Sequence, residues 1–140
     1  HMKLQQATRC ALFAVFELAR DPARQLAAAE IADKYDLSVN HLAKVLRELS
    51  RAKIINSVRG AGGGYTFAAN PKRLTLYEIV SRFEDIHPDE AEAGASGGVT
   101  GVTGVTDATR ALGRVLTEID GITASTLKSI SVATFLKLGR

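Results

Sequence analysis

The chain has 140 residues, of which 46% are hydrophobic, and this length favours one compact domain with room for a small appendage. No apolar run approaches the roughly 20 residues of a membrane-spanning helix, so we expect no membrane contact. The single cysteine, Cys10, excludes an intrachain disulfide and fits the reducing cytoplasm. A formal net charge of +3 is too small to indicate a nucleic-acid partner by itself.

The distribution of charge is more informative than its sum. Residues 44–59 contain five basic side chains and one acidic one, whereas residues 84–92 contain five acidic side chains and no basic one. A basic segment set apart from an acidic one indicates a surface suited to a polyanion. We therefore expect the functional surface to lie around residues 44–59.

Three helices are expected before residue 53. Residues 5–20 contain neither Gly nor Pro and place apolar side chains at helical spacing, which predicts a largely buried first helix. A short second helix is expected over residues 27–35 and an amphipathic third helix over residues 39–52. Ser38 ends the turn between them and is a good N-cap, because its hydroxyl can accept a free backbone N–H. This arrangement is a helix-turn-helix pattern.

A glycine-rich stretch follows the third helix. Gly occupies four of the five positions 60–64, and short β-prone runs lie before and after it. Two such runs joined by a Gly-rich loop predict a β-hairpin. Arg59 stands at the base of the loop, and a thin loop with a cation suits a DNA groove too narrow for a helix. We interpret the hairpin as the wing of a winged helix-turn-helix.

The second half of the chain is less regular. Residues 75–83 are expected to form a further helix with Thr75 as its cap, and residues 86–106 an acidic and then Gly-, Val- and Thr-rich loop. A strong amphipathic helix begins at Asp107 and is expected to end near Gly121. The remaining residues, 123–138, are expected to be helical.

These elements predict a mainly α fold with one small β-hairpin, a winged helix-turn-helix joined to a C-terminal dimerisation helix. The expected division is a DNA-binding domain over residues 1–85, a flexible loop over residues 86–106, and a dimerisation helix with a helical C-terminal segment over residues 107–140. The apolar stripe of the last strong helix, which includes Leu112, would be buried economically by a second copy, so a homodimer is expected.

Double-stranded DNA is the partner that this pattern favours. The first residues of a recognition helix are those that reach bases, so Asn40, His41 and Lys44 are candidates for base edges or phosphates. Asn can pair with adenine and Lys with guanine. Arg47 and Arg51 lie further along the same helix, where contact with phosphates is expected.

In the wing, Arg59 is a candidate for entry into a narrow A·T-rich minor groove. The glycines, beginning with Gly60, allow the backbone to come close to DNA. A nucleotide-binding phosphate loop is the competing interpretation of residues 60–64, but the Lys-Ser/Thr ending and the parallel βα setting are missing. The complete expected set of DNA-binding residues is Ser38, Asn40, His41, Lys44, Arg47, Arg51, Arg59 and Gly60.

Several of these residues together resemble a known family. The run Ala29-Glu30-Ile31-Ala32, the helix from Leu42 to Leu49 and the wing sequence over residues 57–65 look like the bacterial winged-helix regulators that include IscR and NsrR. The resemblance covers residues 2–85 and, more loosely, the helix that begins at Asp107. It implies a cytoplasmic, homodimeric transcription factor, usually a repressor, that binds a palindromic operator.

The chain departs from that family at one place. Many members carry three cysteines before the dimerisation helix, and these hold an iron–sulfur cluster. Residues 84–106 contain no cysteine here, and cluster irons are held mainly by cysteine thiolates. We therefore expect this chain to bind neither the cluster nor another cofactor.

Other functions stay open at this point. The same fold can act as a cluster-independent sensor, with a small-molecule effector bound near residues 84–106 or with Cys10 as a redox switch, although Cys10 is also expected to be a buried core residue. The fold can also serve as a protein-interaction adaptor without DNA binding. His87 and its acidic neighbours fit no fixed metal-ligand spacing. No nucleophile–base pair is evident, so an enzyme is not expected.

Overall fold

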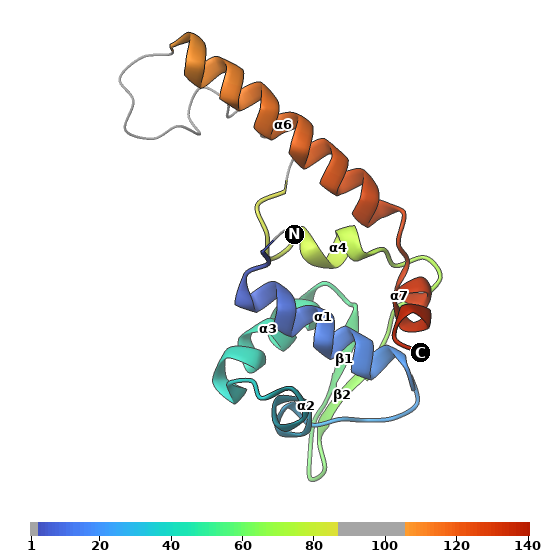
Figure 1. Ribbon diagram of the computed structural model, residues 1–140. Helices are drawn as coiled ribbons and strands as arrows, with labels where there is room; N and C mark the ends of the chain where they lie inside the picture. Colours follow the sequence, from blue (N-terminus) through green and yellow to red (C-terminus); the bar gives the residue numbers. More distant parts are fainter. Residues whose placement is uncertain (1–2, 87–105) are drawn as a thin grey trace.

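The computed structural model of the chain describes residues 3–86 and 106–140. α1 lies in the middle of a helical body, a two-stranded sheet projects from one end, and α6 extends away at the other (Figure 1). The predicted mainly α fold with one hairpin is confirmed. The elements are, in order, α1 (Gln6–Ala19), α2 (Ala28–Tyr35), α3 (Val39–Arg51), β1 (Ile55–Val58), β2 (Gly64–Phe67), α4 (Leu76–Val80), α6 (Asp107–Lys128) and α7 (Val132–Leu138).

α1 is the centre of the core because its inward side chains are small or compact. Cys10, Ala14, Val15 and Leu18 are fully buried, and α1 contacts α2, α3, α4, α7 and β2. Small side chains allow several neighbouring elements to pack closely on one helix. The first predicted helix is confirmed to within one residue at each end.

The helix-turn-helix forms as the sequence predicts. α2 ends at Tyr35, and the C-cap residue Asp36 adopts a left-handed φ of 54°. The Leu37 N–H donates to the Ala32 carbonyl at 2.8 Å. Ser38 then caps α3 by accepting a hydrogen bond from the His41 N–H at 3.3 Å. The apolar face of α3 is buried in the core, so its polar face is directed outward.

A buried carboxylate fastens α1 to α2. Glu17 accepts a hydrogen bond from the Tyr35 hydroxyl and lies 3.0 Å from Lys34 Nζ and 3.5 Å from Arg20 Nη1. Burial alone would raise the pKa of Glu17, but the hydrogen bonds and the two cations outweigh burial and lower it. Burial and the bond to Glu17 raise the pKa of Tyr35 to about 12. An ionised group therefore holds α2 on α1 at neutral pH.

β1 and β2 form the predicted antiparallel hairpin. Ile55 pairs with Phe67 at the base of the sheet, and Val58 pairs with Gly64 near the loop. Ile55 and Phe67 are buried in the core, whereas Val58 is exposed. The base of the hairpin is thus anchored in the body while its loop end lies outside.

The helix after the hairpin is shorter than predicted. α4 ends at Val80 rather than at Phe83, because the Phe83 N–H donates to a carbonyl three residues back, that of Val80, at 3.0 Å. Such bonds tighten a last turn and end the α-helical path. The predicted cap is confirmed, since Thr75 Oγ1 accepts a hydrogen bond from the Glu78 N–H at 3.4 Å.

The long C-terminal helix does not end at Gly121. α6 runs unbroken from Asp107 to Lys128, so the predicted end is wrong. One interior glycine costs only about 1 kcal/mol relative to alanine, and the apolar pattern continues beyond it, with Ala124 buried against Val80. The predicted helical segment 123–138 is therefore divided between α6 and α7.

α7 returns the chain to the core. The Leu76 N–H donates to the Ile130 carbonyl at 2.9 Å, and the Val132 N–H donates to the Leu74 carbonyl at 2.8 Å. Val132 is fully buried among the residues of α1 and α4. The last residues of the chain are thus packed with the helix-turn-helix body, while α6 projects from it (Figure 1).

Candidate nucleic-acid interface

The outward face of α3 is polar and basic. Asn40, Lys44, Arg47 and Arg51 are all exposed, and their spacing of four, three and four residues places them on one side of the helix. Ser38 is exposed at the N-terminal end of the same helix. These side chains supply both hydrogen-bond donors and cations to whatever meets this face.

His41 is positioned differently from its neighbours. It is half-buried, and its Nε2 atom is enclosed with no hydrogen-bond partner among the described residues. Its backbone N–H is already bonded to Ser38. Only part of the imidazole is therefore available at the surface of α3, and a role for His41 in reading bases stays a prediction.

The far end of the α3 face is partly neutralised by an acid. Glu48 lies 3.6 Å from Arg51 Nη1 and 3.8 Å from Arg82 Nη1. Arg82 comes from the turn after α4, so the sequence pattern gave no reason to place it beside α3. The three side chains are all more than a third exposed, and surface ion pairs of this kind are weak. Arg51 can therefore exchange Glu48 for a phosphate at little cost.

The tip of the wing is exposed over residues 59–62. Gly60 has a φ of 105°, which other residues rarely adopt, and the Gly63 N–H donates to the Gly60 carbonyl at 2.9 Å to close the turn. Arg59 is exposed at the base of this turn. The loop projects beyond α2, at the end of the molecule remote from α6 (Figure 1).

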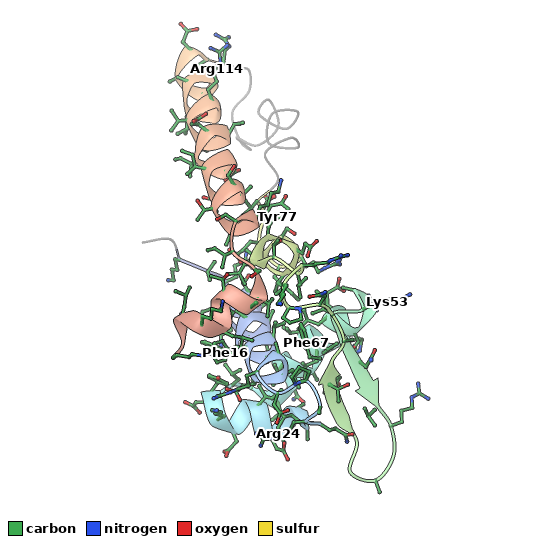
Figure 2. All side chains as sticks on the ribbon, turned by 90° about the vertical axis from the view of Figure 1, so that its right-hand side faces the viewer. Phe16, Arg24, Lys53, Phe67, Tyr77 and Arg114 are labelled. Atoms are coloured by element: carbon green, nitrogen blue, oxygen red, sulfur yellow. The ribbon has the colours of Figure 1, made fainter. Side chains whose placement is uncertain are left out.

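The wing begins directly at the end of α3. Lys53 adopts a left-handed φ of 61°, and the Ile54 N–H donates to the Leu49 carbonyl at 3.1 Å. The chain therefore turns from α3 into β1 within three residues. Figure 2 shows Lys53 at the end of the sheet opposite the loop. α3 and the wing are thus joined by one tight turn.

A second attachment holds the wing from the segment before α2. Leu26 and Tyr65 exchange two backbone hydrogen bonds, of 3.0 and 2.8 Å, and the Gln25 side chain donates to the Gly62 carbonyl. Sequence reasoning missed both residues, because an isolated bridge in an irregular segment has no periodic pattern. Leu26 and Gln25 fix the angle of the wing relative to the helix-turn-helix.

Gly64 is required for this attachment, and we expect Gly64→Ala to destabilise the protein by about 1–3 kcal/mol, the usual cost of overpacking. A Cβ atom at residue 64 would lie 2.5 Å from the Leu26 carbonyl oxygen. The backbone of Leu26 or of β2 must therefore move apart. Thermal or urea unfolding monitored by circular dichroism measures the change.

Gly121→Ala is the matched control for that substitution. Nothing lies within 4 Å of the added Cβ, and Gly121 is inside a helix, where alanine is favoured by about 1 kcal/mol. This variant should be as stable as the wild type or more stable. Equal stability of Gly64→Ala and the wild type would show that the bridge to Leu26 is not rigid.

A winged helix-turn-helix with an outward polar α3 is the fold of a class of transcriptional regulators. The chain belongs to the Rrf2 family, whose description is iron-dependent transcriptional regulator and which matches residues 4–137. The protein is thus a DNA-binding regulator of the helix-turn-helix type and not an enzyme. None of the described helices combines the length and apolar character that crossing a membrane requires.

Individual relatives agree with this assignment. The chain is 52% identical over 137 residues to BadM of Rhodopseudomonas palustris, a protein named as an HTH-type transcriptional regulator, and the match covers 98% of this chain and 83% of that one. It is 34% identical over 102 residues to the regulator IscR of Cereibacter sphaeroides, covering 70% and 66%. Among solved structures, IscR of T. potens gives a TM-score of 0.74 at 23% identity, covering 99% and 89%, and supports the fold.

The family's description mentions iron, but this chain lacks the set of cysteines that would hold an iron–sulfur cluster. Cys10 is the single cysteine of the sequence and is fully buried. Burial raises the pKa of its thiol, and the charge of Arg9 offsets this only in part. Because iron–sulfur clusters need several thiolates, the residues present do not fit the cluster. A buried neutral thiol is also poorly suited to a redox switch.

Two expectations concern segments that are not described. The loop proposed to bind an effector, residues 84–106, is described only over residues 84–86 and at Thr106, and His87 lies outside the described residues with its acidic neighbours at positions 89–92. Within residues 3–86 and 106–140, no group of three or more His, Cys, Asp or Glu side chains lies close enough to hold a metal ion.

Proposed function

We propose that the protein acts in the cytoplasm as a homodimeric repressor that binds a palindromic operator in double-stranded DNA. α3 enters the major groove, and the wing enters the adjacent minor groove. One observation carries this proposal: the exposed basic face of α3 and the wing with its exposed, cationic tip are joined directly by the tight turn at Lys53. One duplex can therefore meet both elements of a subunit.

The roles of the individual residues follow from their positions. Asn40 and Lys44, near the N-terminal end of α3, are proposed to contact base edges, with the available part of His41 beside them. Arg47 and Arg51 lie further along and are proposed to contact phosphates. In the wing, Arg59 is proposed to enter the minor groove. Ser38 and Gly60 are proposed to bring backbone groups close to phosphates.

α6 is proposed to join the two subunits. It belongs to the segment 107–140, for which the sequence predicts a dimerisation helix. Five large apolar side chains are 49–60% exposed along it: Leu112, Val115, Leu116, Ile119 and Ile122. They recur at helical spacing and therefore form one stripe. A stripe of this size on a small protein favours a second apolar surface as its partner, and the same stripe of a second copy fits by symmetry.

The experiment is selection of bound sites from random duplexes, followed by gel shifts of the best site at increasing salt. We expect a palindrome. Arg47 and Arg51 give two phosphate contacts per subunit and four per dimer, so the slope of log affinity against log salt should be about −4 or steeper. Failure to retain any duplex at low salt would favour the adaptor function instead. Recovery of single, unpaired half-sites would contradict the homodimer.

A further inference from the structure

A groove lies on the side of the helical body where α1, the end of α2 and α7 meet. Its volume is about 320 Å³, and its lining is almost entirely apolar: Phe13, Phe16, Tyr35, Phe135, Leu138 and Gly139. That volume is within the range of small-molecule sites. Figure 2 shows Phe16 where α1 meets α7. None of the proposed DNA-contacting residues lines this groove.

The walls of the groove are held in place by ring packing. Phe13 and Tyr35 stack in parallel, with ring centroids 4.6 Å apart and an interplanar angle of 2°. Phe16 and Phe135 meet edge to face at 5.3 Å. Both arrangements are favourable for aromatic pairs. The side of the groove formed by Leu138 is open, since this leucine is 71% exposed.

Cations surround these rings. The Arg9 guanidinium lies 5.7 Å from the centre of the Phe13 ring, and that of Arg20 lies 5.8 Å from the centre of the Phe16 ring. Arg9, Phe13, Phe16 and Arg20 are spaced four, three and four residues apart, so they lie on one face of α1. Arg9 lies on one side of Phe13 and Phe16 along the helix, and Arg20 lies on the other. Arg20 is paired with Glu17, whereas Arg9 makes no ion pair with any described residue.

We infer that this groove binds a small planar aromatic anion, its ring between the aromatic walls and its acid group toward Arg9. Rigid ring walls favour a flat ligand that loses little conformational freedom on binding. The unpaired cation selects a negative charge over a neutral group. The inference concerns binding alone and does not depend on the proposed binding of DNA.

The probe is the dye 1-anilinonaphthalene-8-sulfonate, a flat aromatic anion whose fluorescence rises in an apolar site. We expect saturable binding to the wild type. Leu138→Glu, which puts a carboxylate at the open side, should weaken binding about tenfold or more. Val58→Glu is the matched control, because it makes the same kind of change on the wing, and should bind as the wild type does. Both residues are exposed, so both variants should fold.

Arg9→Gln tests the charge of the ligand. It should weaken binding of the anionic dye by about threefold and leave binding of the neutral analogue N-phenyl-1-naphthylamine unchanged. Unaltered dye binding by Leu138→Glu would overturn the proposal, as would equal losses for both dyes in Arg9→Gln. No saturable signal in the wild type, together with a lower mass of Leu138→Glu in light scattering, would show that a second copy covers the groove.

Discussion

Replacing Leu112 by glutamate is expected to produce monomers that bind the operator about 100-fold less tightly than the wild type. Leu112 is 50% exposed on the α6 stripe, so the variant should fold, but a carboxylate in the dimer interface would be buried without a partner. Two linked DNA-binding heads gain at least about 10² in affinity over one head. Light scattering gives the mass, and gel shifts give the affinity.

Arg114→Glu is the matched control for this change. It also puts a glutamate on an exposed residue of α6, but at two positions from Leu112, about 200° around the helix axis, it lies on the side away from the Leu112 stripe. It should remain dimeric and bind the operator as the wild type does. A dimeric Leu112→Glu variant with full affinity would show that another surface joins the subunits.

Local signals explain which parts of the fold could be predicted. α3 combines a capping residue, Ser38, with an uninterrupted apolar face, and both act within a few residues of the chain. The Gly-rich wing likewise needs only its own turn and flanking strands. The predicted end of α6 at Gly121 is wrong because a glycine is a weak stop signal inside a strong helix. It lowers helix stability by only about 1 kcal/mol relative to alanine, which is small beside the burial of a continuing apolar stripe.

Tertiary contacts account for what could not be predicted. Leu26 pairs with Tyr65 almost forty residues later, and α7 is held by the Leu74 and Leu76 backbone; neither contact leaves a periodic trace. In the candidate site, composition identified the cations of α3 and the wing, but not the partial burial of His41. That burial depends on how α3 rests against its neighbours, which spacing alone does not determine.

Arg59→Ala is expected to weaken operator binding about 30-fold and to remove the preference for A·T pairs beside the half-sites. Arg59 is exposed at the wing tip, and an arginine in a narrow minor groove is attracted by the enhanced negative potential there. A contact of this kind is worth about 1 kcal/mol or more. The dimer carries two wings, so the substitution removes two such contacts. The loss of binding free energy is then about 2 kcal/mol, which corresponds to about 30-fold in affinity.

Arg114→Ala separates this effect from a general loss of charge. Arg114 is exposed on α6 and lies at the far end of the molecule from the hairpin (Figure 2), so its loss should change affinity little at matched salt. Exchanging the flanking A·T pairs for G·C should weaken the wild type and Arg114→Ala but leave Arg59→Ala unaffected. If Arg59→Ala responded to that exchange as the wild type does, the wing would contact phosphates only, and the A·T preference would have to come from the bending of the duplex around α3.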